Sequence, residues 1–380
     1  MTSPVERQKR VIEMDVIRCF ALFGVLLVNL TMIDATMYSY VASPLLHVDL
    51  LDQMASWAIH IFAVGKFYTL FSMLFGLGFY YFLNKPGNPL ENEYYYKRRL
   101  WLLMFMGVIH LIFVWHGDIL HVYAVTGFIL FSMRKKDHKA LIKQAGILLL
   151  FSTALFVIAQ GSSEVALQSE MIQASIDAYK QPNYLTMVAY RLGNEVPITL
   201  LNLIFVIIKI LGLFTIGYAI GKMNIFNKIK ENLIQIRRFF MLTAALSLII
   251  IFGYVFAMVN LKNPQVAVFF DELLTLSGAF AYASALILLY NSERFKKIVK
   301  PLAAAGQMAL TNYLVQTVFF TTYFYGYGLG KFGSLHQPDY ILLALVFYVI
   351  QVVISNLWLK SHKYGPCEWL WRKLTYLQNR

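Results

Sequence analysis

Charged side chains are scarce in this chain. Asp, Glu, Lys and Arg make up 14% of its 380 residues, whereas hydrophobic residues make up 59%. An ordinary globular domain has roughly 25% charged and about 45–50% apolar residues. Runs of about 20 mostly apolar residues recur along the sequence, and each can cross a hydrocarbon layer about 30 Å thick. This composition excludes a water-soluble protein and predicts an all-α integral membrane protein.

Cysteine is nearly absent as well, since the chain has only Cys19 and Cys367. Two cysteines cannot build a disulfide framework, and their positions do not match a metal-binding spacing. The sequence also lacks a glycine-rich nucleotide loop, a P-loop and the serine elbow of hydrolases. No motif therefore fixes a reaction class, and no metal site is expected.

Ten apolar segments account for the hydropathy pattern. The expected spans lie near residues 17–33, 59–82, 99–115, 119–133, 144–160, 198–220, 239–259, 272–290, 302–322 and 340–359. The first is interpreted as a span because no small-residue cleavage site follows it. A polar extracytoplasmic segment at 161–196 divides the chain into a five-span bundle at 1–160 and another at 197–380.

Lysine and arginine determine the expected orientation. Most of the 33 basic residues fall in the two terminal segments and in the alternate loops between spans. The positive-inside rule then places both termini in the cytoplasm, in a multi-pass protein of the cytoplasmic membrane. The net charge of +13 fits attraction to anionic lipid head groups. Nucleic acid is not an expected partner, because no soluble domain exists to read a groove.

The segment Gly107–Gly127 concentrates titratable groups in an apolar setting. His110 lies about 16 Å along a helix from the last cytoplasmic arginine, just beyond the membrane midplane. It is expected either to act as an acid or base or to join helices. Asp118 either caps a helix or orients an imidazole. His116 and His121 are expected at the wet tip of a hairpin, where a histidine costs little.

Two lysines lie inside predicted spans, where an ionisable group costs about 2.5–3.5 kcal/mol and marks a pathway or site. Lys66 is expected either to extend outward to the interface or to meet an anion or a carboxylate. Lys209 lies near the midplane and has no obvious partner in the sequence. It therefore suggests a polar cavity.

Other polar residues are spaced to share helix faces. Asp15 and Arg18 are three residues apart and form either an interfacial ion pair or part of a site. Asn312 and Gln316 are four apart, and such amides often join helices. A polar line through the membrane, whose convergence the sequence does not establish, is outlined by Arg18, Asn29, Lys66, His110, Asn312 and Gln316.

Five blocks carry a resemblance to a known family. They are "MDVIRCFALFGVLLVNL", "GKFYTLFSMLFGLGF", "RRLWLLMFMGVIH" with "GDILHVYAVTG", "GQMALTNYLVQTVFFTTYFYGYGLGKFG" and "YGPCEWLWRKLTY". Over residues 10–376 the chain resembles the YeiB-like family of bacterial inner-membrane proteins, and beyond residue 220 it resembles that family's C-terminal domain of unknown function. The first block also resembles the DxxRG start of membrane-bound acyltransferases, including the lysosomal enzyme that acetylates heparan glucosamine. Cys19 here replaces the usual glycine.

The resemblance implies an acyltransferase that moves an acyl group from cytosolic acyl-coenzyme A, such as acetyl-coenzyme A, to an extracytoplasmic or lipid-linked acceptor. His110 is the candidate base, oriented by Asp118, and Lys66 or a nearby amide is the candidate for stabilising the oxyanion. His47 and His60 are alternative bases. The candidate substrate-binding residues are Asp15, Arg18, Asn29, Asn312, Tyr313, Gln316, Glu368 and Arg372.

Two other functions are consistent with the residues. A transporter of an anionic or amphipathic solute would use the same polar line as its pathway, with both buried lysines as anion contacts. A structural or lipid-binding protein would tolerate substitutions along that line with losses of stability alone. The expected partners are membrane lipids, acyl-coenzyme A and a second copy of the chain.

Overall fold

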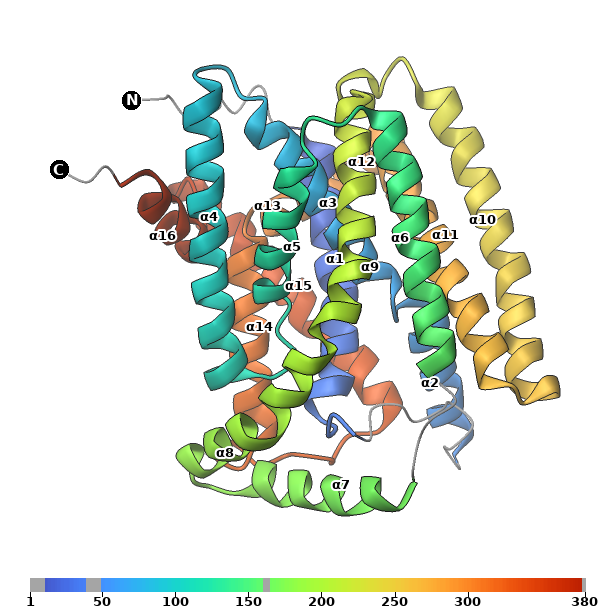
Figure 1. The fold of residues 1–380 in the computed structure, drawn as a ribbon, viewed down its shortest axis with the longest axis vertical. Coiled ribbons are helices and arrows are strands. Elements are labelled where there is room, and N and C mark those ends of the chain that lie inside the picture. The colour runs from blue at the N-terminus through green and yellow to red at the C-terminus, as the bar shows by residue number, and fades with distance from the viewer. Residues whose placement is uncertain (1–10, 39–48, 160–164, 378–380) are drawn as a thin grey trace.

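The computed structural model describes residues 11–38, 49–159 and 165–377. Every regular element in these ranges is a helix, which confirms the predicted all-α class (Figure 1). In chain order the elements are α1 (Ile12–Ile33), α2 (Leu50–Phe62), α3 (Lys66–Leu83), α4 (Pro89–Ile109), η3 (His110–Val114), α5 (Leu120–Ser132), α6 (His138–Ala159), α7 (Val165–Lys180), α8 (Tyr184–Tyr190), η4 (Arg191–Glu195), α9 (Val196–Lys222), η5 (Ile225–Lys228), α10 (Leu233–Phe256), η6 (Ala257–Leu261), α11 (Pro264–Asn291), α12 (Glu293–Val299), α13 (Leu302–Gln307), α14 (Ala309–Phe324), α15 (Gln337–Ser361) and α16 (Pro366–Tyr376).

Seven helical segments in the described ranges are long and apolar enough to cross a membrane. They are Ile12–Ile33, Leu50–Leu83, His138–Ala159, Tyr184–Lys222, Leu233–Leu261, Pro264–Asn291 and Gln337–Ser361. These segments support a multi-pass membrane protein.

The other three predicted spans are short, charged or interrupted. The span at 119–133 corresponds to α5, whose 13 residues rise only about 20 Å. The span at 99–115 is the second half of α4 together with η3, and the first half of α4 is strongly polar. The span at 302–322 is divided at Met308 into α13 and α14. Length and hydropathy alone therefore do not qualify them as spans.

Local sequence explains where several helices begin. Asn88 and Asn263 each precede a proline at the first helical position, and each accepts a backbone hydrogen bond from the first turn of α4 or α11. Proline is favoured there because its fixed φ suits a helix and its missing N–H would be unpaired anyway. Gly65, with φ +81°, separates α2 from α3. It breaks a 34-residue apolar stretch into two helices.

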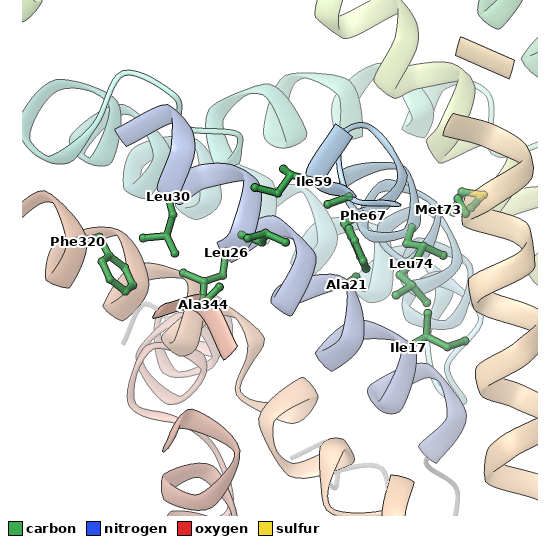
Figure 2. Close-up of a cluster of buried hydrophobic side chains, with 14 of the residues drawn as sticks. Ile17, Ala21, Leu26, Leu30, Ile59, Phe67, Met73, Leu74, Phe320 and Ala344 are labelled. Atoms are coloured by element: carbon green, nitrogen blue, oxygen red, sulfur yellow. The ribbon is translucent and has the colours of Figure 1, made fainter. Parts of the chain in front are cut away.

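Helix α1 lies within the main cluster of buried side chains (Figure 2). Leu30 of α1 faces Phe320 of α14 and Ala344 of α15, while Phe67 of α3 packs on another side of α1. One buried cluster thus includes residues from both predicted bundles. The domain boundaries at 160 and 197 stay a prediction.

Helices α3 and α9 cross at very close range. A Cβ atom added to Gly76 of α3 would lie 2.0 Å from the carbonyl oxygen of Phe214, and one added to Gly217 of α9 would lie 1.9 Å from that of Met73. Small residues allow this approach, which drives helix association where no hydrophobic effect operates between apolar helices. The second half of the chain is therefore seated directly against the first.

Different elements lie at the two ends of the bundle. Helix α1 begins at the end where α16 lies, and α7 lies across the opposite end (Figure 1). The loops that follow α5 and α9 lie at the end with α16 and bond to the ends of neighbouring helices. Tyr80 donates to Asn224, and Tyr218 and Lys222 both donate to the carbonyl oxygen of Arg134.

Candidate functional site

The hairpin between α4 and α5 positions three titratable residues. Helix α4 passes into the π-helical turn η3 at His110, an irregularity often found at functional sites. Gly107 lets the two helices touch, because a Cβ atom there would lie 2.3 Å from the backbone nitrogen of His121. The close approach brings His110, Asp118 and His121 together.

These residues form a buried cluster, which we call the triad. His110, Asp118 and His121 are exposed by only 3%, 4% and 3%. One carboxylate oxygen of Asp118 lies 3.1 Å from Nδ1 of His110, and the other lies 2.8 Å from Nδ1 of His121. The second oxygen also accepts the backbone N–H of His121, 3.1 Å away, as a helix cap would. Asp118 therefore both caps α5 and orients two imidazoles.

Several polar atoms around the triad have no hydrogen-bond partner. In the described part of the chain these include Nε2 of both triad histidines and the indole nitrogen of Trp115. The His110–Asp118 contact is short but not aligned as a hydrogen bond. Tyr313 of α14 packs against His110, with ring centroids 5.6 Å apart. Because unpaired buried polar groups are costly, such a group of atoms suits a ligand or a reaction.

A cavity of about 480 Å³ passes beside the triad. Its volume is in the range of small-molecule sites, roughly 300–1,000 Å³. The lining on α1 runs from Arg18 to Met32, a rise of about 21 Å. Most of the lining is apolar or aromatic, with Trp115 and Tyr313 on the triad side and Arg99 near the α16 end. The cavity therefore extends through much of the bundle.

Two full-length relatives identify the family. The Bacillus subtilis (strain 168) protein YxaH, described as uncharacterized, is 30% identical over 407 residues, which cover 99% of this chain and 96% of YxaH. The Escherichia coli (strain K12) protein YeiB, also described as uncharacterized, is 27% identical over 387 residues, which cover 97% of this chain and 96% of YeiB.

The chain belongs to the YeiB-like family. Residues 220–378 match the family model described as a protein of unknown function, DUF418. No solved structure matches the chain. The triad lies outside the DUF418 match but inside the region shared with YxaH and YeiB.

Four of the predicted binding residues line the cavity of this YeiB-like protein. They are Arg18, Asn29, Tyr313 and Glu368. Arg18 also lies 2.6 Å from Asp15, as the predicted ion pair requires. Of the predicted polar line, Arg18 and Asn29 of α1 line the cavity.

The remaining predicted residues lie behind the cavity wall. His110 and Asp118 are not among the lining residues, although the neighbours Gly117 and Ile119 are. The Gln316 amide donates to Gln351 of α15, 2.7 Å away, and the Asn312 amide donates to Ser355, 3.1 Å away. These two amides join α14 to α15, which is the structural alternative that the sequence left open.

Glu368 and Arg372 both belong to α16 but differ in their contacts. The Glu368 carboxylate accepts the backbone N–H groups of Leu310 and Thr311, at 2.7 and 3.0 Å, and so caps α14. The guanidinium of Arg372 lies over the rings of Tyr364 and Tyr376. Arg372 is not a lining residue of the cavity.

Both buried lysines have carboxylate partners, contrary to the idea that Lys209 lacks one. Lys209 Nζ lies 2.6 Å from a Glu272 oxygen, and Lys66 Nζ lies 3.4 Å from an Asp271 oxygen. Lys66 also donates to the backbone carbonyl of His60, 3.0 Å away. Both acids lie on α11, and their carboxylates balance the positive charges of the two lysines inside the bundle. Lys66 does not line the cavity, so its predicted oxyanion role has no geometric support there.

His116 and His121 are not at a wet tip, because each is about as buried as His110. Helices α7 and α8 cover that end of the bundle, and Tyr179 and Glu195 meet His116 there. The Glu195 carboxylate lies 3.1 Å from Nδ1 of His116 and accepts the Tyr179 hydroxyl at 2.5 Å. Arg191 is fully buried, and its Nε atom lies 3.8 Å from the same Glu195 carboxylate. Sequence reasoning missed this second cluster.

The alternative bases are not nearer to the cavity. His47 lies outside the described residues. Nε2 of His60 lies 3.4 Å from Asp271 and its ring stacks on Tyr254, away from the cavity lining. Within the described ranges, no group of three or more acidic, histidine or cysteine side chains is arranged to hold a metal ion.

Proposed function

We propose that this protein is an acyl-coenzyme A-dependent acyltransferase of the bacterial cytoplasmic membrane, which moves the acyl group to an extracytoplasmic or lipid-linked acceptor. The observation that carries the proposal is the cavity, which links Arg18 and Arg99 at one end with the α4–α5 hairpin at the other. Its wall residue Tyr313 contacts His110 of the triad. In this proposal the donor and the acceptor meet inside one cavity.

The accompanying topology has ten crossings and both termini in the cytoplasm. Helix α4 with η3, α5, and α13 with α14 supply the three crossings beyond the seven long apolar segments. Irregular or short helices are tolerated at membrane depth where they line a cavity, and these three crossings all contribute lining residues. The basic loops after α3, α5 and α9 then face the cytoplasm.

The chemistry follows from the orientation of the triad. With a proton on Nδ1 facing Asp118, Nε2 of His110 is a free base. It receives the proton of the acceptor hydroxyl or amine, for which the acceptor must pass the Tyr313 ring that packs against His110 at the cavity wall. The acceptor oxygen or nitrogen bonds to the thioester carbonyl carbon, the C–S bond breaks, and coenzyme A leaves as a thiolate that takes up the proton.

The oxyanion needs hydrogen-bond donors inside the cavity. Trp115 is 1% exposed, lines the cavity and has an indole N–H without a partner among the described residues. Together with Tyr313 it suits this role better than Lys66, which is paired with Asp271. Such a pre-arranged donor is worth about 10²–10³ in turnover in enzymes of known mechanism.

Transport of an anionic or amphipathic solute is the second candidate. The observation in its favour is that neither His110 nor Asp118 lines the cavity, while the lining follows α1 for most of a membrane crossing. In that case the triad would couple protonation to a change of conformation. The same cavity would then hold a solute that passes through unchanged.

One reconstitution separates the two functions. The purified protein is placed in vesicles of bacterial lipid, acyl-coenzyme A with a labelled acyl group is added outside, and both free thiol and labelled products are followed. Acyltransferase activity predicts one free coenzyme A thiol for each acyl group transferred. Accumulation of intact acyl-coenzyme A inside the vesicles, without thiol release, would establish transport and refute the enzyme.

A further inference from the structure

A group of cations lies at the α16 end of the cavity. The Arg99 guanidinium stacks on the ring of Trp371, 3.9 Å from its centroid, and stands 5.0 Å from that of Phe82. Lys85 Nζ lies over the same Phe82 ring at 3.8 Å. Arg99, Phe82 and Trp371 all line the cavity. Two basic side chains therefore share one aromatic surface at this end of the cavity.

Arg372 adds a third charge from α16. Its guanidinium lies 5.1 Å from the ring centroid of Tyr376, whose hydroxyl lies 3.4 Å from Lys85 Nζ. Lys85, Arg99 and Arg372, here called the basic cluster, thus come from three separate segments of the chain. Their aromatic contacts fix the positions of the cations but leave their charges without a counter-ion.

The basic cluster is not neutralised within the protein. In the described part of the chain none of its three members has an ion pair, whereas Arg18 nearby is paired with Asp15. Glu368 lines the same end of the cavity, but its carboxylate is taken up by the backbone N–H groups of α14. Burial and the two neighbouring guanidiniums lower the pKa of Lys85 to about 7. Half-buried positive charge beside a cavity favours the binding of an anion, which would also favour the charged form of Lys85.

We propose that Lys85, Arg99 and Arg372 bind a phosphate group of a ligand whose remaining part lies in the cavity. Planar guanidiniums bind phosphate oxygens in pairs, and a doubly charged phosphate matches several cations better than one carboxylate does. The assignment rests on the proposed function, because it takes the α16 end of the cavity as the end that binds the acyl donor. Coenzyme A and an anionic phospholipid both supply such a phosphate.

The test measures binding rather than turnover. Radiolabelled coenzyme A is titrated onto the purified full-length protein in detergent, with pantetheine as the phosphate-free probe. Arg99→Gln and Lys85→Gln are compared with Lys300→Gln, a control on an exposed lysine after α12. Loss of a charged hydrogen bond should weaken coenzyme A binding roughly 10- to 100-fold in each cluster variant. Lys300→Gln should bind as the wild type does, and pantetheine should not distinguish the variants.

A second arm identifies the source of the phosphate. Thermal unfolding is measured in nanodiscs of phosphatidylglycerol and of phosphatidylcholine. If coenzyme A does not bind but phosphatidylglycerol stabilises the wild type and not the cluster variants, the phosphate site stands and the donor role fails. If no phosphate probe distinguishes the cluster variants from Lys300→Gln, the proposal is overturned, whether or not acyl transfer is observed. Lys85→Gln keeps the test decisive should Arg99→Gln unfold, because among the described residues the Lys85 ammonium contacts the Phe82 ring and, at 3.4 Å, the Tyr376 hydroxyl.

Discussion

Replacing Gly107 with alanine tests the packing that assembles the triad. The added Cβ atom would lie 2.3 Å from the His121 nitrogen and 2.9 Å from the backbone of Leu120. Both neighbours are backbone atoms of α5, so neither can rotate away. To reach ordinary van der Waals contact, α4 and α5 must separate by about 1 Å at this point.

The expected cost follows from that displacement. Overpacking of a well-packed site costs about 1–3 kcal/mol, against which the better helix propensity of alanine returns up to about 1 kcal/mol. The Gly107→Ala variant should therefore be less stable than the wild type. Moving α5 also carries Asp118 and His121 away from His110. A misplacement of about 1 Å can lower turnover by about 10²-fold.

The assay is thermal unfolding of the purified variants in one detergent. Gly146→Ala is the matched control, because Gly146 lies on the exposed face of α6 with no atom within 4 Å of an added Cβ. It should leave the midpoint unchanged or raise it, while Gly107→Ala lowers it. Equal midpoints for the two variants would refute the close α4–α5 contact and, with it, the geometry of the triad.

Two further predictions concern buried charges. Burial raises the pKa of Asp34 from 3.8 to about 6, so deprotonation of this carboxyl opposes folding. The free energy of unfolding should therefore fall by up to about 3 kcal/mol as the pH rises from about 4 to 6. In thermal unfolding measured from pH 4 to 7, the midpoint of Asp34→Asn should fall less than that of the wild type. An equal fall in both proteins would contradict the raised pKa of Asp34. Glu272→Gln leaves Lys209 buried without its partner and should cost about 3–5 kcal/mol, whereas the paired change to methionine at both positions should recover most of the loss. A double variant no more stable than Glu272→Gln would contradict that pairing.

Features encoded within one hairpin or one helix were predictable. His110 and Asp118 are eight residues apart, and the short hairpin brings them together as the sequence predicts. The ion pair of Asp15 with Arg18 follows from helical spacing. In both cases the geometry depends on local structure, which the residue spacing determines.

Contacts between distant segments were not predictable in the same way. Hydropathy indicates which segments can span the membrane but not which face meets which neighbour. Lys209 therefore appeared to have no partner, although Glu272 lies 63 residues further on. A signal was present, since Asp271 and Glu272 are acids inside an apolar run, where such residues usually have a partner or a function.

The buried end under α7 was missed for a related reason. Arg191 and Glu195 have i, i+4 spacing, yet they fall in a segment that reads as a polar loop. Only the folded arrangement of α7 and α8 removes them and His116 from solvent. The sequence alone could not show that this segment covers the hairpin.

The most direct test of the account compares His110→Gln with His362→Gln, a control on an exposed histidine after α15, in the acyl-transfer assay. Thermal unfolding should first show that both variants fold. Loss of a general base should lower the transfer rate about 10²–10⁴-fold in His110→Gln and leave His362→Gln at the wild-type rate. A folded His110→Gln protein that transfers acyl groups at the wild-type rate would contradict the central claim that the triad carries the chemistry.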